Sequence, residues 1–129
     1  MRVCLDTNAY SRLMRNQTEL QRCLEEAEII HVPTIVLGEL YAGFCLGSRY
    51  ADNCRDLEAF LELPGVQIAT PSQDVAERYG YLVRDLRQQG TPIPTNDLWI
   101  AAAALETGAR LVSYDAHFQH VPGLIVIAP

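Results

Sequence analysis

Five short apolar segments, separated mostly by longer stretches with helical periodicity, constrain the fold of this chain more than any other feature. The apolar segments lie at 3–5, 29–32, 66–69, 111–113 and 124–127. Helical patterns cover 9–15, 18–28, 34–46, 50–63, 71–89 and 95–107. Strands that alternate with helices pair in parallel and are covered by helices on both faces. We therefore expect a three-layer α/β/α sandwich around a central, mainly parallel five-stranded sheet.

The length of the chain fits one globular domain spanning residues 1–129. Its hydrophobic content of 49% is typical of a folded protein and excludes general disorder. No apolar run approaches the roughly 20 residues that span a bilayer. The first residues turn polar too early for a signal peptide. These features predict a soluble cytoplasmic protein with no membrane association.

The four cysteines show neither a CxxC pair nor the spacing of a zinc site. Cys4, Cys23 and Cys45 lie in apolar, periodic segments, so we expect reduced thiols in the core.

The charged residues exclude several kinds of chemistry. All ten basic residues are arginine, so the chain has no phosphate-binding loop of the GK[ST] type and no Schiff-base lysine. A formal net charge of −6 argues against nucleic-acid binding by electrostatics alone. It leaves open a nuclease whose carboxylates are covered by a metal ion.

Two acids follow strands that, if both are parallel and central, end at the same edge of the sheet. Asp6 comes directly after the first apolar segment, and Asp115 comes two residues after Ser113, at the end of the fourth. In a parallel sheet, ligands bind beyond the carboxyl ends of the strands. Each acid has a purely structural alternative, since Asp6 would also serve as a helix N-cap and Asp115 as a turn residue.

Two further acids lie in apolar helical segments. Asp97 shares a helix face with Ile100 and Ala104, so it should point from the edge of the core toward the strand ends. Interaction with the helix dipole is its structural alternative. Glu39 is the only charged residue between positions 34 and 46, where an acid is costly unless it is paired or bound to a metal. A buried arginine partner is the alternative for Glu39.

A cluster of these four acids would need a cation. Two unit charges about 4 Å apart repel by about 4 kcal/mol at an effective dielectric constant near 20. All-oxygen ligation suits Mg²⁺ or Mn²⁺, which also bind phosphate oxygens. The sequence thus points to hydrolysis of a phosphodiester by a carboxylate-bound metal.

The motifs around these acids resemble those of the PIN-domain family. They are Asp6-Thr7-Asn8, Glu39 within an apolar helix, residues 96–102 (NDLWIAA) and residues 113–118 (SYDAHF). The resemblance covers nearly the whole chain, with the motifs in the family's order. More narrowly, the chain is similar to the VapC-type toxins of prokaryotic toxin–antitoxin pairs.

The resemblance implies a Mg²⁺- or Mn²⁺-dependent endoribonuclease that cleaves cellular RNA and inhibits translation or growth. Asp6, Glu39 and Asp97 would be its principal catalytic and metal-binding acids, with Asp115 a more variable fourth. One or two metal ions are both compatible with this set.

The resemblance also assigns supporting residues and partners. Asn8 and Ser113 would support the site through hydrogen bonds, while the role of Thr7 is less defined. The family is commonly dimeric and neutralised by a cognate, VapB-like antitoxin, so we expect a homodimer with such a partner. An antitoxin peptide would lie in an apolar groove. Candidate lining residues, for which plain core packing is the alternative, are Leu37, Leu40, Tyr41 and Phe44.

Other basic residues and histidines near the four acids give less specific indications. Arg12 and Arg15 lie near the Asp6 loop and would hold RNA phosphates, although a solvated helix face is the alternative. His117 and His120 have no cysteine near them for a zinc site, so we interpret both as structural or exposed.

Two other functions remain open from the sequence. One is a PIN nuclease acting in RNA processing or on DNA, which a short upstream gene for a DNA-binding partner would argue against. The other is a non-catalytic interaction module that holds only a structural cation.

Overall fold

The computed structural model describes all 129 residues and contains one five-stranded sheet. The strands are β1 (Arg2–Leu5), β2 (Ile29–Pro33), β3 (Val66–Ala69), β4 (Arg110–Val112) and β5 (Val126–Ile127). Their order across the sheet is β3-β2-β1-β4-β5, and every neighbouring pair is parallel. The predicted sheet is confirmed, and it is parallel throughout.

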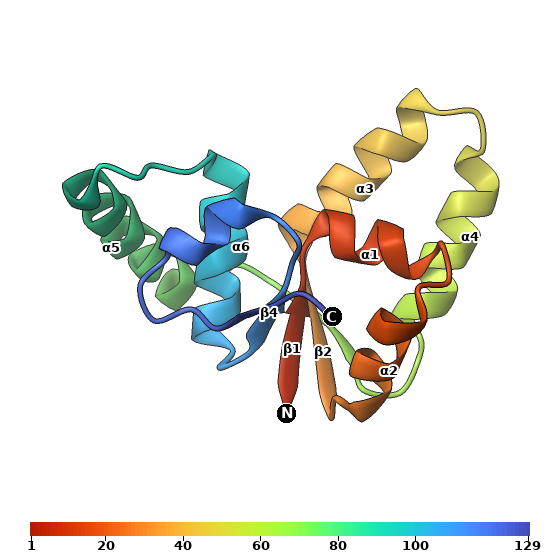
Figure 1. The fold of residues 1–129 in the computed structure, drawn as a ribbon. Coiled ribbons are helices and arrows are strands. Elements are labelled where there is room, and N and C mark those ends of the chain that lie inside the picture. The colour runs from red at the N-terminus through yellow and green to blue at the C-terminus, as the bar shows by residue number, and fades with distance from the viewer.

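Helices cover both faces of this sheet, which confirms the three-layer architecture. They are α1 (Thr7–Leu13), α2 (Thr18–Glu26), α3 (Thr34–Leu46), α4 (Tyr50–Leu61), α5 (Gln73–Gln89) and α6 (Thr95–Glu106), with a 3₁₀ helix, η1 (Ala116–His120). Figure 1 shows α5 and α6 on one side of the sheet and α1 to α4 on the other. The α3–α4 hairpin projects beyond the sheet.

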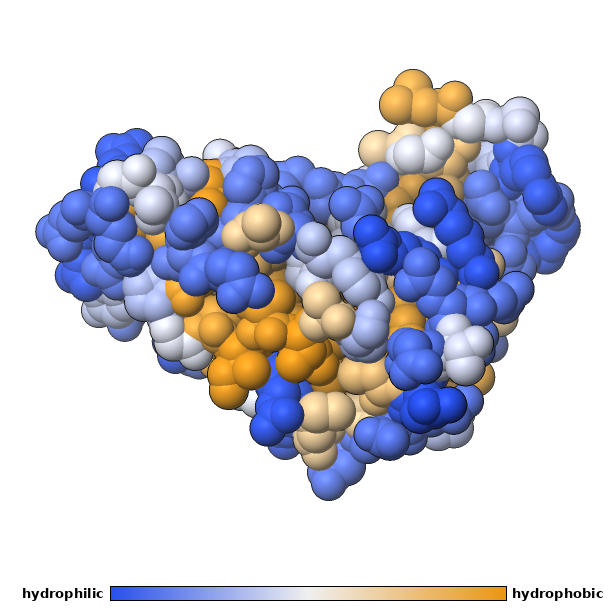
Figure 2. All heavy atoms as spheres, in the orientation of Figure 1, coloured by the Kyte–Doolittle hydropathy of each residue, from blue (hydrophilic) through white to orange (hydrophobic).

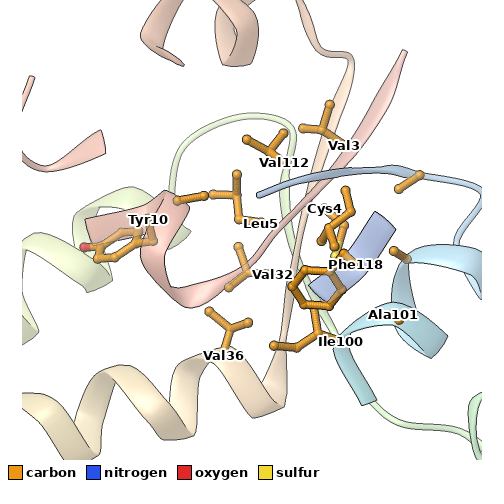
Figure 3. Packing of buried hydrophobic residues seen from close by; sticks show 14 of the residues in the cluster. Val3, Cys4, Leu5, Tyr10, Val32, Val36, Ile100, Ala101, Val112 and Phe118 are labelled. Atoms are coloured by element: carbon orange, nitrogen blue, oxygen red, sulfur yellow. The ribbon is translucent and has the colours of Figure 1, made fainter. Parts of the chain in front are cut away.

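The central strand β1 is buried on both faces, as its apolar sequence requires. Val3, Cys4 and Leu5 have no solvent exposure. Figure 3 shows Cys4 beside Phe118 and Ile100, while Leu5 lies near Val32 and Val112. A strand packed on both faces needs apolar side chains at successive positions, and this explains the unbroken apolar run.

Two helix boundaries differ from the prediction, because strand pairing or helix capping sets them. The helix predicted over 18–28 ends at Glu26, because the Glu28 amide donates to the Met1 carbonyl and Ile29 pairs with Arg2. The helix predicted from residue 9 begins at Thr7, directly after its cap at Asp6.

The end of the chain also differs from the sequence prediction. The fifth strand is limited to Val126–Ile127, after a turn in which Gly123 has a positive φ. The 3₁₀ helix η1 lies in a segment for which no element is predicted.

The expectation of a core position is wrong for Cys45. All four cysteines are free and Cys4 is buried, but Cys45 is exposed near the end of α3. The end of this helix extends past the core, and the nearby Leu46 is 90% exposed. Figure 2 shows an apolar patch at this projecting tip of the molecule.

None of the helices is both long enough and apolar enough to cross a lipid bilayer.

Candidate metal centre

Asp6 lies at the carboxyl end of the central strand and is fixed there by hydrogen bonds. Its Oδ1 accepts from the Ala9 amide at 2.8 Å, which makes Asp6 the N-cap of α1. Its Oδ2 accepts from the Ser113 hydroxyl at 2.5 Å, across from the end of β4. The side chain is almost fully buried, with the residue 5% exposed. Asp6 is thus the helix N-cap that the sequence offered as its structural role. The capping bond uses only Oδ1, one of its two carboxylate oxygens.

Glu39 projects from α3 toward the same edge and contacts no arginine. The Thr7 hydroxyl donates to Glu39 Oε1 at 2.6 Å, and the side-chain Nδ2 of Asn96 donates to Oε2 at 3.5 Å. The arginine partner considered as the alternative for Glu39 is absent, because no ion pair involves this residue. Neutral donors from α1 and α6 hold the carboxylate instead.

Asp97 and Asp115 face a common neighbour, His117. The imidazole Nδ1 lies 3.7 Å from Asp97 Oδ2 and 3.1 Å from Asp115 Oδ1. Asp97 is in the first turn of α6, whereas Asp115 is the N-cap of η1 and accepts from the His117 amide at 2.9 Å. The Asp115 amide in turn donates to Ser113 Oγ at 3.1 Å, which links this acid to the group that bonds Asp6.

The four carboxylates act on one another electrostatically. Burial raises the pKa of Asp6, and the charges of Asp115 and Glu39 raise it further, against the opposing effect of its two hydrogen bonds. Burial also raises the pKa of Asp97, and Asp115, Glu39 and Asp6 add to this while His117 lowers it. The cluster thus contains more negative charge than its own hydrogen bonds neutralise.

The donor set fits a hard divalent cation. Four carboxylates from separate segments meet at one edge, and none forms an ion pair with an arginine. A bound cation would remove the repulsion that raises the pKa values of Asp6 and Asp97. Carboxylate oxygens are the ligands that Mg²⁺ and Mn²⁺ prefer, so these side chains suit either ion.

A polar hollow of about 300 Å³ lies directly beside Asp115. It is lined by Asn8, Ser11, Arg12, Arg15, Tyr114 and Asp115. The Arg12 guanidinium stacks 3.9 Å above the centre of the Tyr114 ring. The sequence-predicted Arg12 and Arg15 therefore share this hollow with Asp115, and Asn8 lines it too.

Sequence reasoning missed the contacts of three residues in this region. Thr7 and Asn96 both bond Glu39, and His117 faces two of the acids. Of the two roles predicted for His117, structural or exposed, the structure shows the second, with its side chain 53% exposed. No sequence signal identified this role of His117, because an exposed histidine near a turn is common.

The fold and the site together define a class: a three-layer α/β domain with a carboxylate cluster at the carboxyl edge of a parallel sheet. The PIN domain family model matches residues 3–124. The chain therefore belongs to the PIN-domain family, among its VapC-type members.

Individual relatives agree with this placement. Ribonuclease VapC1 of Haemophilus influenzae strain R2866 is 30% identical over 126 residues, which covers 93% of this chain and 92% of the relative. VapBC2 from Rickettsia felis, solved bound to a DNA fragment from its promoter, has a chain that superposes with a TM-score of 0.88 at 29% identity and 98% coverage of both chains. A toxin–antitoxin complex from Klebsiella pneumoniae has a chain with a TM-score of 0.74 at 25% identity, covering 98% of this chain and 97% of that one.

Proposed function

We propose that this chain is a Mg²⁺- or Mn²⁺-dependent endoribonuclease and the toxin of a toxin–antitoxin pair, which inhibits translation or growth by cleaving cellular RNA. The observation behind this proposal is the convergence of Asp6, Glu39, Asp97 and Asp115 at one sheet edge without an arginine partner. The ribonuclease name of the VapC1 relative supports the choice of RNA as the substrate.

In this proposal, Asp6, Glu39 and Asp97 hold the cation, and Asp115 is a fourth ligand or orients bound water. A divalent cation in such a site polarises the phosphodiester and lowers the pKa of the attacking water. The chain's own residues then act by positioning. Ser113 and the Ala9 amide orient Asp6.

The second pair of positioning groups acts on Glu39. The Thr7 hydroxyl and the Asn96 amide each bond one of its two oxygens, so the carboxylate cannot rotate freely. Neutral donors fix its direction without cancelling its charge, which keeps the carboxylate available to a cation.

RNA phosphates would enter through the polar hollow beside Asp115. Arg12 and Arg15 line it and offer planar guanidinium groups that bind two phosphate oxygens at once. The four acids account for four of the six net negative charges of the chain. Once they are covered by metal, the remaining surface opposes RNA only weakly.

The partner in this proposal is a VapB-like antitoxin, and the active form is a cytoplasmic homodimer of a single domain spanning residues 1–129. The toxin–antitoxin complex among the similar structures supports such a partner. The proposed groove lining needs one revision, because Leu40 is 4% exposed and belongs to the core. Leu37, Tyr41 and Phe44 are partly buried and remain candidates.

The test is cleavage of a panel of structured and single-stranded RNAs by the purified, partner-free protein with Mg²⁺, Mn²⁺ or EDTA. Asp97→Asn removes one central acid, and we expect a loss of about a thousandfold in rate, because metal-assisted catalysis supplies several kcal/mol. The matched control is Asp85→Asn, an acid on α5 that bonds the neighbouring Arg84.

Cleavage that continues in EDTA, or in Asp97→Asn at the wild-type rate, would contradict the proposed mechanism. Failure to cut any RNA, together with failure to bind Mn²⁺ in calorimetry, would favour the non-catalytic interaction module.

A further inference from the structure

His117 adds a nitrogen donor to a cluster that is otherwise made of carboxylates. One donor atom each from Asp97, Asp115 and His117 lie within 4.8 Å of one another. Asp97 belongs to α6, while Asp115 and His117 come from the start of η1. The three side chains therefore form a mixed oxygen and nitrogen donor set on one flank of the acid cluster.

The position of His117 is fixed by the fold of η1. The Asp115 carboxylate caps this helix and accepts from the His117 amide at 2.9 Å. The next residue, Phe118, is 1% exposed and, as Figure 3 shows, lies beside Cys4, Ile100 and Ala101. Successive side chains of a 3₁₀ helix diverge by about 120°, so burial of Phe118 turns His117 away from the core. The imidazole is held near the acids by the backbone and not by its own contacts alone.

Two of the three separations are compatible with ligands around one ion. In an octahedral site with bonds of about 2.1 Å, adjacent ligands lie about 3.0 Å apart and opposite ligands about 4.2 Å apart. His117 Nδ1 lies 3.1 Å from Asp115 Oδ1 and 3.7 Å from Asp97 Oδ2, within this range. Small side-chain rotations would bring all three atoms to a common cation.

We propose that His117 is a nitrogen ligand of a cation position shared with Asp97 and Asp115, and that this ligand makes the position prefer Mn²⁺ to Mg²⁺. Both ions favour oxygen ligands, but Mn²⁺ is a first-row transition metal, whereas Mg²⁺ demands near-ideal octahedral geometry and dehydrates reluctantly. An imidazole ligand therefore costs Mg²⁺ more than Mn²⁺, and this difference is the physical basis of the preference. The proposal rests on the metal site of the proposed function but adds a ligand and a selectivity to it. The competing explanation is that the imidazole only forms an ion pair with the two carboxylates.

The test uses the full-length protein with Mn²⁺ or Mg²⁺ alone, without RNA. Pulsed electron paramagnetic resonance of bound Mn²⁺ reports directly whether a ¹⁴N nucleus is coordinated, and calorimetry gives both affinities. The variants are His117→Ala and His117→Asn, which keeps a polar side chain without the imidazole. The matched control is His120→Ala, since His120 is an exposed histidine of the same 3₁₀ helix.

We expect a ¹⁴N coupling in the wild type and in His120→Ala that is lost in both His117 variants. Mn²⁺ affinity should fall about tenfold or more in those variants, since loss of even an indirect metal partner costs 10–100-fold. Mg²⁺ affinity should change much less, so the ratio of the two affinities falls.

The proposal is overturned if wild-type Mn²⁺ shows no ¹⁴N coupling, if the coupling persists without His117, or if both affinities fall equally. Loss of Mn²⁺ binding in Asp97→Asn without any ¹⁴N coupling in the wild type would reject His117 as a ligand and leave the proposed function intact. Absence of any Mn²⁺ binding by the wild type would reject both.

Discussion

The two ends of the sheet contain hollows of opposite character. At the carboxyl end, a polar hollow of about 300 Å³ adjoins the acid cluster. At the amino ends of β2 and β3, a larger hollow of about 580 Å³ is lined mostly by apolar side chains. Its apolar lining includes Leu13, Met14, Leu24, Ile30, Phe60, Leu63 and Val66. The larger hollow is not the one beside the acid cluster, so size alone would not select the proposed site.

The two ends also contribute oppositely to stability. Around the apolar hollow, burial of side chains such as Leu24 and Phe60 stabilises the fold. At the acid cluster, burial and like charge raise the pKa values of Asp6 and Asp97, so the ionised carboxylates destabilise the metal-free fold. The apolar packing and the proposed metal site therefore lie at different ends of the sheet, and substitutions should separate their effects.

The largest expected effect is on stability, at the apolar end. Phe60→Ala removes a ring that packs edge-on against Tyr10, with the two ring centroids 5.4 Å apart. Phe60 is 6% exposed. We expect a loss of about 3–5 kcal/mol in the free energy of unfolding, measured by urea denaturation. Below the unfolding transition, Mn²⁺ affinity should be unchanged. The control Tyr81→Ala, at a residue 51% exposed, should cost less than about 0.5 kcal/mol. A matching loss of Mn²⁺ affinity in Phe60→Ala would contradict the expectation that substitutions at the apolar end leave metal binding unchanged.

Addition of metal should have the next largest effect, at the carboxyl end. A ligand that binds only the folded state at 100 times its Kd stabilises that state by about 2.7 kcal/mol. We expect saturating Mn²⁺ to raise the Tm of the wild type measured by calorimetry. The increase should largely disappear in Asp97→Asn and persist in Phe60→Ala. Equal increases in all three proteins would indicate that the ion binds elsewhere.

The substitution Asp97→Asn should stabilise the metal-free protein while removing its activity. The folded-state pKa of Asp97 is raised, so the folded protein binds this proton more tightly than the unfolded chain. At neutral pH the ionised Asp97 therefore destabilises the fold. The stability of the metal-free wild-type protein should increase as the pH falls toward about 4. In EDTA we expect Asp97→Asn to raise the Tm by a few degrees and to flatten this pH dependence. A lower Tm than wild type would show that the carboxylate stabilises the metal-free fold.

The smallest expected effect concerns RNA binding in the polar hollow. Arg15→Gln removes one proposed phosphate contact, which should weaken RNA binding about fivefold at 0.1 M salt and lower the slope of log affinity against log salt by about 0.7. The control is Arg22→Gln, an exposed arginine of α2 that pairs with Glu19. Equal effects of the two substitutions would indicate a general charge effect and not a contact in the hollow.

Much of the fold could be predicted because its rules are local or periodic. The apolar run before Asp6 marks the buried central strand, and the alternation with helices requires parallel pairing. Boundaries failed where a distant partner decides them. The end of α2 at Glu26 depends on Met1 and Arg2, which no pattern within residues 18–28 reveals.

The candidate site likewise contains residues that the sequence could predict and residues that it could not. Asp6, Glu39, Asp97 and Asp115 stand out in the sequence, because an acid beside apolar residues or at a strand end is costly unless something compensates it. His117 does not stand out, since an exposed histidine costs nothing on its own. Its proximity to Asp97 exists only because η1 is anchored by Phe118 against the core.

The sequence by itself determined the layer architecture, the strand direction and the four acids, because hydrophobic periodicity and the cost of burying charge act on each segment separately. Only the tertiary structure decided the strand order, the bonds of Thr7 and Asn96 to Glu39, and the position of His117. These features join residues far apart in the chain; Asn96 and Glu39, for example, are separated by 57 positions. No local pattern specifies which distant side chains come within hydrogen-bonding distance.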